Sequence, residues 1–283
     1  MSFKTFDNED IIVSADSISS TVWTTDTYEL TTFFTSSTQE AATSGDYYLN
    51  VYQTGSDLSN AAVQFSVAYG HKDGLGSTPY NINVAGKSPT STIYGQYRSL
   101  VLGDEEQDFL FGGVTSTKGL YAISVDRARY KEKLLPGTFN ITLNNGVNTI
   151  TLTDNSNQTS TVTYNDAGRV YDIITGSNGV AYDNGTGYTP SSGGYIASYG
   201  KFLPDIGVII LNGQALDNTF NGLFTTGSND SNGANNGKLQ DIITSFKLNS
   251  EETVSSNYVF VRVRNSEFNY SNNPSNITGQ ENK

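Results

Sequence analysis

The feature that most constrains the fold is a strict alternation of apolar with small or polar residues between Ala62 and His71. Every second position of this segment carries a large apolar side chain, namely Val63, Phe65, Val67 and Tyr69. Successive side chains of a β-strand point to opposite faces, so a repeat of two places these four on one face. The segment is therefore predicted to be a strand with a buried apolar face.

Comparable patterns recur along the chain and predict further strands, at positions 46–53, 120–125, 138–165, 207–211 and 258–264. Within 138–165, Asn144-Asn145-Gly146 separates two alternating runs and is typical of a hairpin turn. Apolar residues between 92 and 102 follow a helical repeat, with Gly103 as the expected end of a short helix. Residues 239–248 fit either a helical turn or a strand.

These elements predict a mainly β fold, with antiparallel sheets of the β-sandwich kind and a few short helices. The many Tyr, Phe, Gly and Asn residues suit strands joined by turns. The hairpin region 138–165 looks self-contained and suggests a domain boundary. Two β-rich domains are therefore expected, residues 1–137 with the short helix near 92–102, and residues 138–283 with the hairpin region.

Charge and composition limit the partners. The formal net charge is −12, which repels nucleic acid phosphates and an anionic membrane surface at long range. No apolar run approaches the roughly 20 residues that a membrane-spanning helix needs. The first ten residues are polar and acidic, so no signal peptide is expected there. We therefore expect synthesis in the cytoplasm, no binding of nucleic acid and no membrane insertion.

Residues that could support catalysis are sparse. The chain has no cysteine and one histidine, His71, which is expected to be a solvated residue at a strand end. One histidine without a nucleophile motif makes a catalytic triad or a usual zinc site a poor interpretation. An acidic cluster at 104–108 contains carboxylates for glycoside hydrolysis or cation binding, but its spacing favours a solvated loop. We expect no catalytic residue, cofactor or metal.

One dense basic run stands out on this acidic chain, formed by Arg127, Arg129, Lys131 and Lys133. Such a positive island can orient a neighbouring subunit that presents an acidic face. Equally, it can be a solvated surface whose charges pair within the chain. Both interpretations stay open, and the four residues are candidate interface residues.

The segment 176–200 is rich in Gly, Ser and Tyr and is predicted to be a loop. Its tyrosines are Tyr182, Tyr188, Tyr195 and Tyr199. Tyrosine is favoured at protein interfaces because it combines a large apolar body with a polar tip, and aromatic rings also stack on sugars. Packing within the chain is the alternative. We therefore treat the four tyrosines as a second group of candidate interface residues.

Four segments resemble a known family: Ile93-Tyr94-Gly95-Gln96-Tyr97-Arg98, residues 125–137 (VDRARYKEKLLPG), residues 199–208 (YGKFLPDIGV) and residues 261–274 (VRVRNSEFNYSNNP). They are similar to virion structural proteins of T4-like, contractile-tailed phages of marine cyanobacteria. The resemblance implies a component of the tail or baseplate, located in the virion. Its partners would be other virion proteins and copies of itself, and it implies no catalytic residues.

The sequence therefore favours a non-enzymatic structural subunit of a tailed-phage virion. Two alternatives stay open. The first is an adhesin whose tyrosine loop binds a host-surface glycan. The second is a glycan hydrolase that uses paired carboxylates.

Overall fold

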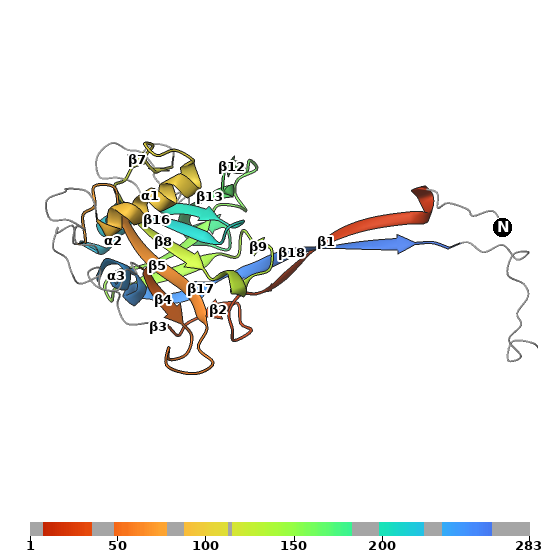
Figure 1. Ribbon diagram of the computed structural model, residues 1–283, viewed down its shortest axis with the longest axis horizontal. Helices are drawn as coiled ribbons and strands as arrows, with labels where there is room; N and C mark the ends of the chain where they lie inside the picture. Colours follow the sequence, from red (N-terminus) through yellow and green to blue (C-terminus); the bar gives the residue numbers. More distant parts are fainter. Residues whose placement is uncertain are drawn as a thin grey trace, which may run out of the picture. The chain divides into compact units, whose positions relative to one another are not determined.

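The computed structural model describes residues 8–35, 48–77, 88–112, 115–182, 198–223 and 234–261 (Figure 1). The chain separates into two compact units. The larger unit runs from Ser19 to Glu252, and the smaller one combines residues 1–18 with residues 253–283. Strands greatly outnumber helices, so the predicted mainly β class with a few short helices is confirmed.

A sheet of 13 strands forms the larger unit. Its strands are β2 (Glu29–Leu30), β3 (Phe34–Thr35), β4 (Tyr48–Tyr52), β5 (Val63–His71), β8 (Gly119–Val125), β10 (Asn140–Asn144), β11 (Thr149–Asp154), β12 (Thr163–Asn165), β13 (Gly168–Ser177), β14 (Val180–Ala181), β15 (Gly200–Leu203), β16 (Val208–Asn212) and β17 (Ile243–Lys247). The order is β2-β17-β10-β11-β13-β15-β16-β8-β5-β4-β3, with β12 and β14 paired to β13. Neighbouring strands run antiparallel.

The remaining elements are short or lie outside this sheet. The helices are α1 (Pro89–Leu102), α2 (Gly213–Phe220) and α3 (Ala234–Ile242), with 3-10 turns η1 (Asn8–Asp10) and η2 (Arg127–Arg129). β6 (Leu110–Phe111) pairs with β7 (Thr115–Ser116). A separate three-stranded sheet has the order β1 (Ile11–Thr21), β18 (Asn249–Val259) and β9 (Lys133–Leu134).

The central strands β8 and β16 are buried on both faces. Leu120 and Ile210 pack in a cluster with α1, whereas Tyr121 and Ile209 belong to a second cluster that includes residues of α2 and α3. Figure 1 shows α1 and α3 on different sides of β5 and β8. A strand that is covered on both faces needs an uninterrupted run of apolar residues. The run Val208–Leu211 meets this need, and the buried strand predicted there is confirmed.

Local signals predicted several elements correctly. Strand β5 lies where the alternation begins, and Phe65, Val67 and Tyr69 are buried. Helix α1 begins with Pro89 at its first turn and ends at Gly103, whose φ of 65° is left-handed. The segment 239–248 contains both of its predicted alternatives, the end of α3 and then β17.

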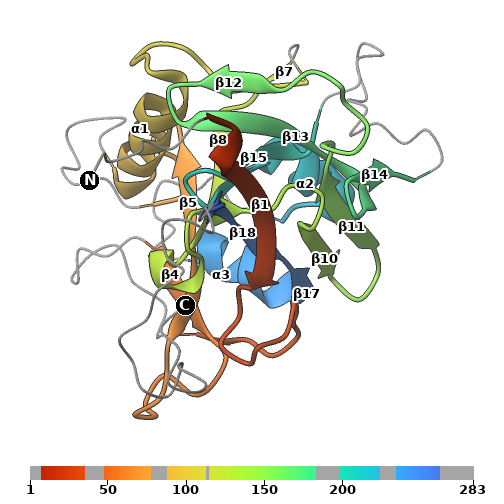
Figure 2. The same cartoon turned by 90° about the vertical axis from the view of Figure 1, so that its right-hand side faces the viewer.

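The predicted domain boundary between 137 and 138 does not coincide with the division of the structure. The hairpin forms as expected, with Asn144 opposite Thr149 and Gly146 at φ 86°. However, β10 also pairs with β17 and β11 with β13, as Figure 2 shows for the hairpin beside β17. A hairpin alone is marginally stable, and this one is completed by β13 and β17. The same sheet also pairs β17 with β2 and β16 with β8, on opposite sides of the predicted boundary. Strand β12, at the end of the region 138–165, pairs with β13.

An ion pair fixes the start of β13 against the turn between β15 and β16. Arg169 donates from Nη2 to Asp205 Oδ1 at 2.7 Å, and its backbone N–H donates to Oδ2 at 2.7 Å. Gly168 has a φ of 101°, and a Cβ there would lie 2.5 Å from Asp205 Oδ2. The close approach of this carboxylate therefore requires glycine at position 168.

We predict that Asp205→Asn lowers the free energy of unfolding at pH 7 by about 1–3 kcal/mol, because it removes charge-assisted hydrogen bonds. Burial raises the pKa of Asp205, but the bonds from Arg169 outweigh burial and hold this pKa below its ordinary value. The stabilisation is therefore complete above about pH 4 and is lost as the pH falls through the folded-state pKa. Denaturant unfolding at pH 7 and stepwise below pH 4 measures this. If the difference in free energy of unfolding between Asp205→Asn and wild type stays constant across that pH range, the prediction is contradicted.

Candidate functional site

The terminal ribbon is the strongest candidate site, and we define it as Ile11–Ile18 with residues 253–261, all within the smaller unit. Strands β1 and β18 are neighbours in the sheet order, and the Phe260 N–H donates to the Asp10 carbonyl at 2.8 Å. The ribbon's exposed apolar side chains are Ile11, Ile12, Val13, Ile18, Val254, Tyr258, Val259, Phe260 and Val261. Their exposed fractions range from 36% to 71%.

This surface is also uncharged over most of its length. Residues 11–15 and 253–261 contain no Asp, Glu, Lys or Arg, although the whole chain carries a formal charge of −12. Monomeric proteins rarely expose contiguous apolar surface of this kind, and such surface marks association with another molecule. The terminal ribbon therefore has the chemistry of a surface that associates with another molecule.

Sequence reasoning missed this site. It predicted a strand at 258–264, whereas β18 spans Asn249–Val259, and Arg262–Arg264 lie outside the described residues. The first half of β18 is rich in Ser, Glu and Thr, so it lacks the apolar alternation of a half-buried strand. Backbone pairing with β9 and β1 makes it extended. The available signals were the runs Ile11-Ile12-Val13 and Tyr258-Val259-Phe260-Val261.

The basic run lies beside the start of β18 within the larger unit. Lys131 Nζ is 2.8 Å from Glu252 Oε2, and Lys133 Nζ is 3.5 Å from Glu251 Oε2. These two cations are therefore paired within the chain, as the solvated-surface interpretation proposed. An ion pair with an exposed lysine, such as Lys131–Glu252, stabilises by only about 0–1 kcal/mol.

The two arginines of the run belong to η2. The Arg127 guanidinium lies 4.7 Å from the centroid of the Tyr130 ring and also donates to the Tyr130 carbonyl. Arg129 is partly buried. The interpretation of the run as a subunit contact therefore depends on Arg127 and Arg129, and it stays a prediction.

The candidate tyrosines do not form one group in the described structure. Tyr182 is 52% exposed, immediately after β14. Tyr199 is buried in the core, and its hydroxyl lies 3.1 Å from Thr219 Oγ1. Its side chain therefore packs within the chain, as the alternative interpretation proposed. Tyr188 and Tyr195 lie outside the described residues.

His71 is buried, so the prediction of a solvated histidine is wrong. It ends the central strand β5, and its Nδ1 accepts a hydrogen bond from the Asp73 N–H at 3.1 Å. Burial lowers the pKa of His71, which favours a neutral imidazole at pH 7. A histidine that caps the following turn in this way has a structural role.

The acidic cluster structures its own loop. Asp104 Oδ1 accepts from the backbone N–H of Glu106 at 2.7 Å and of Gln107 at 3.2 Å, and these bonds hold the pKa of Asp104 below its ordinary value. Asp108 pairs with Lys72. Within the described ranges, no group of three or more potential metal-ligating side chains lies together.

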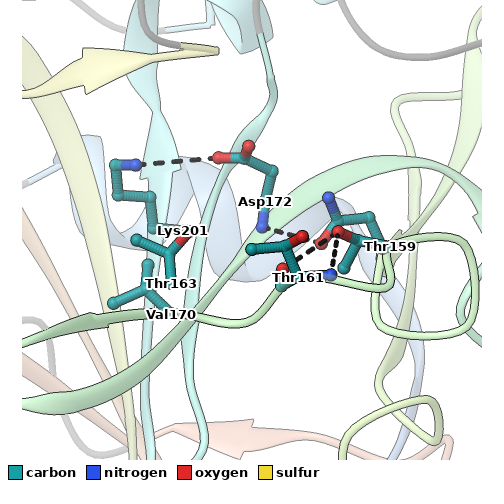
Figure 3. Close-up of a pocket in the computed structure, with 7 residues that line it drawn as sticks. Thr159, Thr161, Thr163, Val170, Asp172 and Lys201 are labelled. Atoms are coloured by element: carbon teal, nitrogen blue, oxygen red, sulfur yellow. Dashed lines mark hydrogen bonds and ion pairs between the residues drawn. The ribbon is translucent and has the colours of Figure 1, made fainter.

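A pocket of about 130 Å³ lies between β12, β13 and β15 (Figure 3). Figure 3 shows Lys201 and Asp172 pointing toward each other, with Nζ to Oδ1 at 3.6 Å. The other lining residues are Asn155, Thr159, Thr161, Thr163 and Val170. This pocket has neither the aromatic platform of a glycan-binding site nor the two carboxylates of a glycosidase.

Comparison of the chain with protein-family models, with curated proteins and with solved structures gave no match. In the described part of the chain, no helix has the length and apolar character needed to cross a membrane.

Proposed function

We propose that this chain is a non-enzymatic structural subunit of a tailed-phage virion, in the tail or baseplate, and that it acts through contacts between subunits. The terminal ribbon carries this proposal, because nine of its apolar side chains are exposed and Asp16 is its one charged residue. Leaving so much apolar surface in water is unfavourable. A subunit contact would remove this apolar surface from water.

The resemblance to virion proteins of cyanophages supports the proposal that the particle is a tailed-phage virion. One of the segments that carry it, residues 125–137, includes β9, which pairs with β18 at Ser250 and Glu251. The expected partners are other tail proteins and further copies of the chain.

The proposal predicts a fixed copy number in purified phage particles. Quantitative mass spectrometry of particles washed at high salt should find the chain at a constant ratio to other tail proteins. High salt screens exposed ion pairs, whereas burial of apolar surface persists under these conditions. Loss of the chain from washed particles, with the other tail proteins retained, contradicts the proposed function.

A further inference from the structure

The one histidine of the chain begins the turn that follows β5, and we define the His71 turn as residues 71–77. The imidazole is 5% exposed, and its Nδ1 accepts a hydrogen bond from the Asp73 N–H at 3.1 Å. The Gly74 N–H donates to the His71 carbonyl at 2.9 Å. A neutral ring whose Nδ1 accepts carries its proton on Nε2, so the bond from Asp73 exists only while the imidazole is neutral.

The His71 turn is connected to the start of α1 by buried hydroxyl groups. Ser88 Oγ donates to the Gly74 carbonyl at 2.7 Å, and Thr90 Oγ1 donates to the Leu75 carbonyl at 2.9 Å. The Thr90 hydroxyl also lies 3.1 Å from the Ser77 hydroxyl. Ser88 is the N-cap of α1. The position of the first turn of this helix therefore depends on the conformation of the His71 turn.

We infer that the His71 turn is an acid-sensitive switch: protonation of His71 at Nδ1 removes the acceptor of the Asp73 N–H, opens the turn and releases the start of α1. An imidazolium has two N–H donors and no acceptor, so the Asp73 N–H would face another donor. Protonation would also place a positive charge in a buried site, which is unfavourable. An open turn exposes the ring to water and avoids both costs. The switch goes beyond the proposed function and does not depend on it.

The two charged groups that act on His71 do not cancel the effect of burial. Burial lowers the pKa of His71 below its ordinary value of 6.5, the Asp73 carboxylate acts in the opposite direction, and the Lys118 ammonium lowers this pKa further. Asp73 Oδ2 accepts a hydrogen bond from Lys118 Nζ at 2.8 Å. The carboxylate that could stabilise an imidazolium is therefore already paired.

The other described elements beside His71 add no unpaired charge. The Tyr69 ring on β5 lies 6.5 Å from the imidazole, and Tyr94 of α1 lies beside the same strand. Burial raises the pKa of both phenols, so both stay neutral. Opposite His71, β8 presents Gly119, which has no side chain. Lys72 forms an ion pair with a carboxylate of the acidic cluster.

The direction of the pH dependence follows from the difference between the closed and the open turn. Well above about pH 6.5 the imidazole is neutral in both states, so pH does not affect closure. Below this value the open turn binds a proton more readily than the closed turn, and the ratio of open to closed turn rises by up to about tenfold per pH unit. The rise ends below the lowered pKa of the closed turn, where both states are protonated.

The first test follows the imidazole in the unmodified chain. Because His71 is the only histidine, its ring signals in a proton–nitrogen NMR spectrum are unambiguous. They should titrate with a midpoint below 6.5, the ordinary value for histidine. A midpoint at or above this value overturns the switch.

The second test compares hydrogen exchange of the wild-type chain with that of His71→Asn. Asparagine Oδ1 can accept from the N–H two residues later in an Asx turn, but it cannot be protonated in this pH range. Comparing the proteins at each pH cancels the pH dependence of chemical exchange. At pH 7 they should exchange alike across residues 71–77 and 88–92. At about pH 5.5 the wild type should exchange up to about tenfold faster in both segments, and β16 should show no difference.

Two results of the exchange comparison contradict the switch. Equal exchange of the two proteins at about pH 5.5 overturns it, and so does a difference that extends equally to β16, because that indicates global unfolding. If His71→Asn does not fold, the wild type alone decides. The exchange of its Asp73 and Gly74 amides, relative to the amides of β16, should rise as the pH falls, and a constant ratio overturns the switch.

Discussion

Replacing Val67 by aspartate is expected to abolish folding. Val67 is fully buried in β5, within the core cluster that also contains Phe65 and Ile123. An aspartate there would bury a carboxylate among apolar side chains, at a cost of several kcal/mol even if the group becomes protonated. Domains are stable by only about 5–15 kcal/mol, and the substitution also leaves a poorly packed site. We therefore expect no cooperative thermal transition by circular dichroism.

The matched control for this substitution is Val147→Asp. Val147 lies in the turn of the β10–β11 hairpin and is 85% exposed, so the same change there should leave the melting temperature nearly unaltered. Soluble Val67→Asp protein with a wild-type melting temperature would show that this face of β5 is not buried.

Trp23→Ala is expected to destabilise the larger unit by about 3–5 kcal/mol, since it empties a large space in the core. The indole is 2% exposed, and its ring centroid lies 5.0 Å from that of Phe246 and 6.2 Å from that of Phe65. Trp23 thus connects the segment after β1 to β17 and β5. The melting temperature should fall on the order of 10 °C.

The control for Trp23→Ala is Tyr164→Ala, which removes an aromatic ring that is 69% exposed on β12. It should lower the melting temperature far less. Circular dichroism is the suitable measurement, because Trp23 is the only tryptophan and its removal abolishes the tryptophan fluorescence. Equal effects of the two substitutions would contradict the packing described for Trp23.

Much of the fold could be predicted because its signals are local. The alternation over Val63–Tyr69 reflects one buried face, and the apolar run Val208–Leu211 reflects burial of both faces. Gly103 and Gly146 mark a helix end and a hairpin turn because both adopt positive φ. These features depend on a few neighbouring residues, which single-sequence reasoning can assess.

Other features depend on partners distant in sequence. The hairpin region looked independent, yet β10 pairs with β17 about a hundred residues later. The pairing of β1 with β18 joins the two ends of the described chain. His71 appeared solvated because flanking residues are polar, but its burial comes from the structure packed around the end of β5. No local pattern encodes such contacts.

The terminal ribbon was not predicted from the sequence as a candidate site, and the residues that were predicted lie elsewhere. The basic run was recognised as unusual, but the pairing of Lys131 and Lys133 with β18 depends on β9 lying beside that strand. Tyr199 was grouped with the loop tyrosines, although its position before β15 buries it. The terminal ribbon combines two short apolar runs, and neither run alone indicates a contact surface.

The central claim is that the chain is a particle subunit joined to its neighbours through the terminal ribbon, and cryo-electron microscopy of intact phage particles tests it most directly. The account predicts tail or baseplate density that fits the sheet of the larger unit. It also predicts that neighbouring polypeptide covers both faces of the ribbon at Ile12, Val13, Tyr258 and Val259. A map that resolves the chain with these side chains facing solvent on both faces, or a fully assigned tail without the chain, would contradict it.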